Sequence, residues 1–92
     1  MKPSFPDAFV LHLLKQDASL INAFRRLVDK VQTRTEQQLR ATKGIHLEPI
    51  KSDPPYQSIR LDQGPRAKVL VDDDTMVFLD LEPDHDKIYG KK

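Results

Sequence analysis

Hydrophobic residues in the first 40 positions recur at the spacing of α-helices. Ser4, Pro6 and Asp7 supply a capping hydroxyl, an early proline and an acidic side chain three residues after the cap. This pattern predicts a short helix over about 4–16. The apolar residues of this helix fall on one broad face and are Phe9, Val10, Leu13 and Leu14.

A second, longer helix is predicted over about 20–40, with Asp17 or Ser19 as its cap. Its apolar stripe is Leu20, Ile21, Phe24, Leu27, Val28, Val31 and Leu39. Basic residues lie mostly on the opposite side, where they are most simply solvated surface: Arg25, Arg26, Lys30, Arg34 and Arg40. We therefore expect residues 4–40 to form a helix hairpin.

The hydrophobic period changes after Gly44. Residues 45–48 alternate between apolar and polar, which predicts a short strand. Three further strands are predicted at about 56–62, 66–71 and 76–81. The connections between these three strands are short and rich in Gly, Pro and Asp, which favours antiparallel hairpins.

Together these elements predict one α+β domain over 1–92. We expect a helix hairpin (about 4–40) on one face of a three- to four-stranded antiparallel sheet (about 45–82), followed by a tail (83–92). The other face of the sheet is expected to be open and polar. Its first polar residues are Ser58, Arg60 and Asp62, which alternate with Gln57, Ile59 and Leu61.

Composition narrows the function classes. The 92 residues include no cysteine, which excludes disulfides, thiolate catalysis and cysteine-ligated zinc. No apolar run reaches the roughly 18 residues of a membrane span, and the start resembles no signal peptide, so we expect a soluble, cytoplasmic protein. The net charge of +1 is weak for a strong nucleic-acid binder.

Several enzyme classes find no support in the sequence. The three glycines are not clustered, so phosphate-binding loops and dinucleotide fingerprints are absent, and there is no nucleophile elbow. Asp72, Asp73 and Asp74 are better explained as a hairpin turn than as a metal loop. The adjacent residues of 84–86 (Asp-His-Asp) rarely converge on one ion. We expect no metal and no small-molecule cofactor.

The order of motifs resembles the RelE/ParE superfamily of small bacterial toxins. The resemblance covers nearly the whole chain: a helix hairpin, a strand with Ser58-Ile59-Arg60-Leu61, a strand opened by Gly64-Pro65-Arg66, and a final His85-Asp86-x-x-Tyr89. It implies a RelE-like fold. It also implies either an mRNA endonuclease that is held inactive by an antitoxin or, in another branch, a gyrase poison.

The resemblance further implies roles for individual residues. Arg60 and Arg66 match basic residues that contact the scissile phosphate, His85 a proton-transfer residue, and Tyr89 a residue that orients or stacks on the substrate. Arginine offers a rigid fork of donors to phosphate, and imidazole titrates near neutrality, so these types suit attack by the 2′-hydroxyl of RNA. We assign the surrounding RNA-binding surface to Ser58, Lys68, Lys87 and His46.

Simpler interpretations remain open for these residues. Arg60 can pair with Asp62 or Asp80, and Arg66 can be a strand-end charge. The other three can be surface or packing residues: His85 in a polar loop, Tyr89 at a sheet edge and His46 in a strand.

The first functional hypothesis is therefore a RelE-like toxin of a type II toxin-antitoxin pair. It would cleave mRNA without a metal, on the ribosome, with the cognate antitoxin as its protein partner. The alternative is a catalytically inactive RelE-like module that binds protein. The near-neutral charge favours this alternative, as does Ser58, which stands where several active members have lysine. A different α+β domain is the third option.

Overall fold

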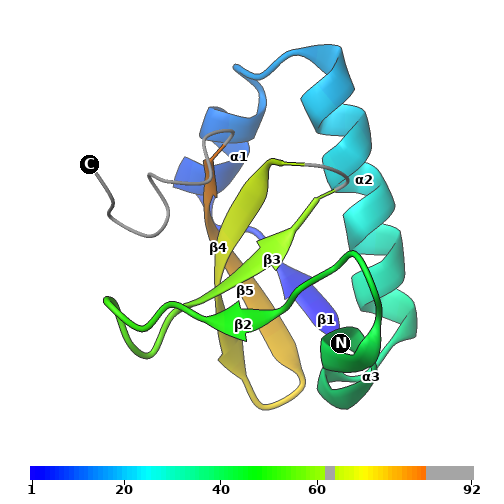
Figure 1. Ribbon diagram of the computed structural model, residues 1–92. Helices are drawn as coiled ribbons and strands as arrows, with labels where there is room; N and C mark the ends of the chain where they lie inside the picture. Colours follow the sequence, from blue (N-terminus) through cyan, green and yellow to red (C-terminus); the bar gives the residue numbers. More distant parts are fainter. Residues whose placement is uncertain (62–63, 83–92) are drawn as a thin grey trace.

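The structure is a computed structural model that describes residues 1–61 and 64–82. Within these residues the chain forms five strands and three helices (Figure 1). Their bounds are β1 (Lys2–Ser4), α1 (Asp7–Leu13), α2 (Ala18–Thr33), α3 (Glu36–Ala41), β2 (Glu48–Pro49), β3 (Gln57–Arg60), β4 (Arg66–Asp72) and β5 (Thr75–Glu82). The predicted α+β class is confirmed. None of the described helices is long and apolar enough to cross a membrane.

The described strands form one sheet in the order β1-β5-β4-β3-β2. β3, β4 and β5 pair antiparallel, as the predicted hairpins require. β2 pairs antiparallel with β3, but β1 runs parallel to β5, with Lys2 beside Thr75. The prediction of three to four antiparallel strands was therefore wrong in number and direction. The reason is that the chain before α1 adds a parallel strand at the edge.

The start of α1 also differs from the prediction. Ser4 does not cap a helix but ends β1, and α1 begins at Asp7. Pro6 takes the cap position, and its carbonyl oxygen accepts hydrogen bonds from the N–H groups of Phe9 (2.9 Å) and Val10 (3.1 Å). Pairing of β1 with β5 keeps Ser4 extended, so tertiary structure overrides the local helix-start signal.

The predicted long helix over 20–40 is two helices, α2 and α3. Asp17 caps α2, as one of the two candidates, and its Oδ1 accepts a hydrogen bond from the Leu20 N–H at 2.8 Å. A second cap starts α3. Thr35 Oγ1 accepts from the Gln38 N–H (3.2 Å), and Gln38 Oε1 accepts from the Thr35 N–H (2.9 Å). This reciprocal pair stabilises a new helix start and redirects the chain.

Replacing Thr35 with alanine should therefore lower the free energy of unfolding by about 1 kcal/mol, because a helix N-H loses its acceptor. Urea denaturation measures this change. Thr33→Ala is a matched control, since both threonines are exposed and the Thr33 hydroxyl bonds only carbonyls of its own helix in the described structure. An equal loss in both variants would contradict a specific role of the cap.

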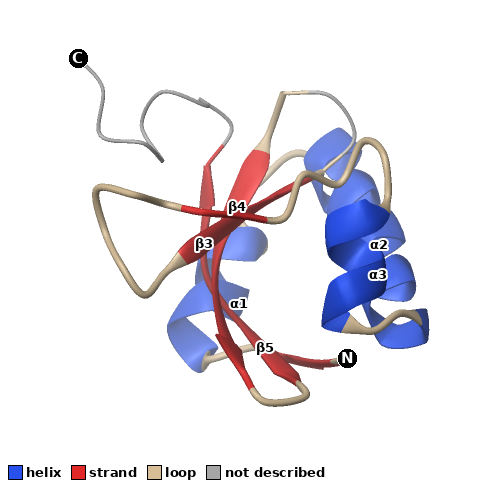
Figure 2. Cartoon of the chain, turned by 60° about the horizontal axis from the view of Figure 1, so that its bottom comes forward, coloured by secondary structure: helices blue, strands red, loops and turns tan. Residues whose placement is uncertain are grey.

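The core lies between the helices and one face of the sheet, with α1 against β5 and α2 against β1 (Figure 2). Phe78 of β5 is fully buried there among other aromatic rings. Its ring centroid lies 5.5 Å from that of Phe5, 5.8 Å from that of Phe9 and 5.2 Å from that of Phe24. The other buried apolar residues of β3 to β5 are Ile59, Ala67, Val69, Met76 and Leu81. The helices therefore cover this face, and the opposite face of the sheet lies away from them.

Candidate functional site

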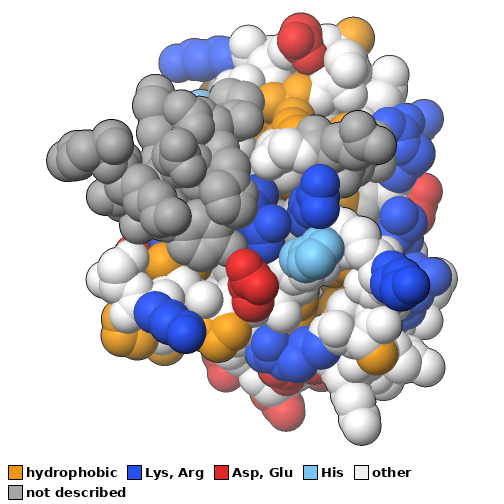
Figure 3. All heavy atoms as spheres, viewed as in Figure 1, with side chains coloured by type: hydrophobic (Ala, Val, Ile, Leu, Met, Phe, Trp, Pro, Cys, Tyr) orange, Lys and Arg blue, Asp and Glu red, His pale blue; other side chains and the backbone are white. Residues whose placement is uncertain are grey.

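The sheet face away from the core carries charged side chains. Residues paired directly across neighbouring strands share a face, and the register places Arg60 opposite Arg66. We call this surface the polar sheet face; its residues are Glu48, Ser58, Arg60, Arg66, Lys68, Asp80 and Glu82. Figure 3 shows basic, acidic and histidine side chains gathered over the middle of the molecule, in the view that has β2 and β3 in front.

Arg66 is buried within this face, at 4% exposure. Its Nε and Nη2 donate to the Ser58 hydroxyl oxygen at 3.1 and 2.9 Å, and Nη2 also donates to the His46 carbonyl oxygen at 2.8 Å. The Glu48 carboxylate lies 3.7 Å from Nη2. Ser58 is fully buried. The Arg66 guanidinium is therefore held in one orientation by neighbours on two segments of the chain, residues 46–48 and β3.

Arg60 differs from Arg66 although the two face each other across β3 and β4. It is half-buried, and its backbone N–H is bonded to the Ile45 carbonyl oxygen at 2.6 Å. Within the described residues its guanidinium makes no hydrogen bond or ion pair. Arg60 therefore combines a fixed backbone with a positive charge that a ligand can reach.

The ion pair between Arg60 and Asp80, one of the sequence alternatives, does not form. Asp80 Oδ1 instead lies 3.6 Å from His12 Nε2 and accepts a hydrogen bond from the Leu81 N–H. Asp62, the other suggested partner, lies outside the described residues.

Lys68 lies on the same face but is engaged by its own neighbours. Its Nζ donates to the Asp53 carboxylate at 2.5 Å and lies 4.5 Å from the centre of the Tyr56 ring. No local sequence pattern indicates this pair, because Asp53 belongs to the loop between β2 and β3 and meets Lys68 only through the fold. The charge of Lys68 is thus compensated locally.

His46 is exposed and lies outside the strands, so the predicted strand over 45–48 was wrong; β2 starts at Glu48. The backbone of His46 has φ +52°, a left-handed conformation that is uncommon for residues with a side chain. Its carbonyl oxygen accepts the hydrogen bond from Arg66 described above. This bond helps to keep His46 in an unusual conformation next to the polar sheet face.

The other three predicted site residues, His85, Lys87 and Tyr89, lie outside the described residues. Their roles stay predictions. The five that are described, Ser58, Arg60, Arg66, Lys68 and His46, meet at or beside the polar sheet face. Glu48 and Asp53 were not predicted, and no sequence pattern marked them as partners of the basic residues.

What this arrangement offers chemically is a fixed buried guanidinium, a reachable one and an exposed imidazole. Among the described residues, no group of three or more His, Asp or Glu side chains is arranged to hold a metal ion. Arginine and imidazole groups at one surface suit a phosphate ligand. No protein-family model matches this chain, and comparison with curated proteins and with solved structures finds no match either.

Proposed function

We propose that this chain is a RelE-like toxin that cleaves RNA at the polar sheet face. The observation that carries the proposal is the pairing of Arg60 with Arg66 across β3 and β4. One of these guanidinium groups is locked in place and the other is accessible. Like charges placed side by side repel each other, so such a pair favours the binding of an anion.

The proposed reaction needs no metal. The 2′-hydroxyl oxygen of a ribose attacks the adjacent phosphorus, the bond from phosphorus to the next 5′-oxygen breaks, and a cyclic phosphate results. A base takes the hydroxyl proton and an acid protonates the leaving oxygen. Arg60 would stabilise the charge that builds up on the phosphate, with Arg66 as a fixed positive charge beside it. His46 and His85 are the candidates for proton transfer, and Tyr89 for holding the base.

The proposed substrate is mRNA on the ribosome, in the cytoplasm of a bacterium, and the proposed protein partner is a cognate antitoxin. An antitoxin segment with apolar residues would find partners on α1 and just after it, where Leu11 and Leu14 are 62% and 68% exposed.

Arg60→Ala should abolish growth arrest on induced expression and lower RNA cleavage by about 100-fold or more, because one donor to the transition state is lost. Cleavage of reporter mRNA measures the effect. Arg25→Ala is the control, since Arg25 is an exposed arginine on α2. Cleavage by Arg60→Ala at the rate of the unmodified protein would defeat the proposal.

A second candidate is a protein-binding module without nuclease activity. The observation in its favour is charge compensation: Arg66 lies by Glu48 and Lys68 is paired with Asp53. A basic surface whose charges are compensated in this way attracts a polyanion less strongly. If induced expression leaves growth and mRNA intact while one specific protein co-purifies, this second function is the better one.

A further inference from the structure

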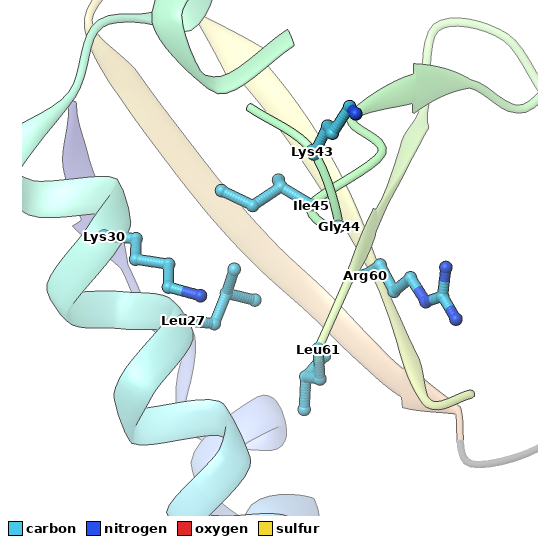
Figure 4. A pocket seen from close by; sticks show the side chains of 7 residues that line it. All are labelled: Leu27, Lys30, Lys43, Gly44, Ile45, Arg60 and Leu61. Carbon is cyan, nitrogen blue, oxygen red and sulfur yellow. The ribbon is translucent and has the colours of Figure 1, made fainter. Parts of the chain in front are cut away.

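Two hollows adjoin each other next to the polar sheet face, on either side of the segment 43–46. The smaller has a volume of about 110 Å³ and lies between α2 and the start of that segment. Its apolar part is made by Leu27, Ile45 and Leu61 (Figure 4). The larger, of about 510 Å³, lies between the end of α3 and His46. The two share Lys43 and Gly44 as lining residues, so they adjoin each other at this segment, and we call them together the depression.

The charged side chains that line both hollows are all basic. Lys30, Lys43 and Arg60 line the smaller one, and Arg40 and Lys43 line the larger one beside His46. Arg40 is neutralised by Glu36, whose carboxylate lies 2.6 Å from Nη2. Lys30, Lys43 and Arg60 have no ion pair within the described residues. The depression is therefore a local concentration of uncompensated positive charge.

These basic groups are spread out and do not converge on one point. Figure 4 shows Lys30 extending from α2 over Leu27 toward the pocket, whereas Arg60 turns its guanidinium away from α2. Lys43 lies on the far side of Ile45 from Lys30 in the same view. A single small anion would meet only one of these charges. A ligand with several charges in a row can meet all three.

Gly44 is the ridge between the two hollows. Its φ of +89° is one that glycine adopts freely, and no atom lies within 4 Å of the position that a Cβ would occupy. A chain-like ligand can therefore pass over the ridge close to the backbone. The smaller hollow alone, at about 110 Å³, is below the roughly 300 Å³ at which pockets for drug-sized molecules begin.

We propose that this depression is a track for the phosphodiester backbone of a single RNA strand, with Lys30, Lys43 and Arg60 as its phosphate contacts. Arg60 belongs to both the track and the polar sheet face, so a strand bound along the track leads directly to the proposed cleavage site. This inference rests on the proposed function. Lys30 and Lys43 have no role in the proposed cleavage reaction. The inference adds them as residues that bind the RNA strand at phosphates other than the one that reacts.

The test is binding of a labelled uridine-only oligonucleotide at several salt concentrations. The double variant Lys30→Gln/Lys43→Gln should bind roughly tenfold more weakly at low salt. Its plot of log affinity against log salt should be less steep by about 1.4, since each contact to a single-strand phosphate contributes about 0.7. The control is Lys15→Gln/Lys51→Gln, which has the same net charge and changes two exposed lysines that line neither hollow.

An unchanged affinity and slope in the track variant would overturn the inference, as would an equal loss in the control or failure of the unmodified protein to bind the oligonucleotide. Displacement of the RNA by poly-glutamate at equal charge concentration would assign the track to an acidic protein and would also overturn it. The proposed function is tested separately. RNA binding that depends on Lys30 and Lys43 without any cleavage would defeat the nuclease and leave the track standing, whereas RNA cleavage by a protein whose affinity does not depend on these lysines would defeat the track alone.

Discussion

Arg66→Ala should lower the free energy of unfolding by about 2–4 kcal/mol, because it removes a buried guanidinium group and the hydrogen bonds that this group donates to Ser58 and His46. The Ser58 hydroxyl is fully buried and loses both donors, and the His46 carbonyl loses its bond to Nη2. Urea denaturation followed by circular dichroism measures the loss. We expect Arg66→Lys to recover little, since an ammonium group cannot reproduce the fork of donors.

The double variant Arg66→Ala/Ser58→Ala is the matched test of this account. If much of the loss comes from the hydrogen bonds between Arg66 and Ser58, the double variant should be less unstable than the sum of its single variants. Arg66→Ala with the stability of the unmodified protein would contradict the buried network. The burial also changes how activity data are interpreted: a loss of growth arrest in Arg66→Ala can follow from instability, whereas Arg60 is accessible and tests the chemistry itself.

Phe78→Ala should destabilise the protein by about 3–5 kcal/mol. Phe78 is fully buried, and the aromatic rings of both helix α1 and helix α2 meet at its side chain. Removing it leaves a cavity that three surrounding rings cannot close without moving. Because domains of this size have total stabilities of about 5–15 kcal/mol, a measurable unfolded fraction is expected at elevated temperature.

Phe5→Ala provides the comparison, since Phe5 contacts Phe78 but is 39% exposed. We expect a loss of about 1 kcal/mol for this variant. Calorimetry on both proteins gives the two values. A smaller effect for Phe78 than for Phe5 would show that the ring cluster does not form the centre of the core.

The features that could be predicted from the sequence are those that depend on the local spacing of apolar and polar residues. The apolar stripe of α2 was predicted, and Phe24, Leu27 and Val31 are buried as expected. The alternation of β3 was predicted as well: Ile59 faces the core, and Arg60 lies on the other side. In both cases the signal comes from neighbours in the chain that repeat at the period of the element.

The errors come from contacts between distant parts of the chain. The local sequence predicts a helix start at Ser4, whereas β1 forms there through pairing with β5, whose residues are more than 70 positions away. The break between α2 and α3 did have a local signal, Thr35 and Gln38 at capping-box spacing, but the apolar stripe continues to Leu39 and hides it. A prediction based only on the hydrophobic period therefore treats α2 and α3 as one helix.

In the candidate site, too, the features set by local spacing were predicted and those set by distant contacts were not. The period of β3 correctly places Ser58 and Arg60 on one face, yet it gives no information about depth. Ser58 is fully buried, and its hydroxyl oxygen accepts hydrogen bonds from Arg66, which also donates to the carbonyl oxygen of His46. Whether a polar residue on a sheet face meets solvent or a neighbour depends on tertiary contacts, which a single sequence does not encode at any short spacing.

The parallel pairing of β1 with β5 has a consequence for biosynthesis. Among the described strands, β1 is synthesised first and β5 last. β1 therefore has no strand to pair with until nearly the whole sheet has been synthesised. Nascent chains that end before Thr75 should lack the native hydrogen bonds of β1 and should be easily digested by proteases. Such long-range closure slows folding, so we expect the native state to be acquired late and cooperatively after synthesis.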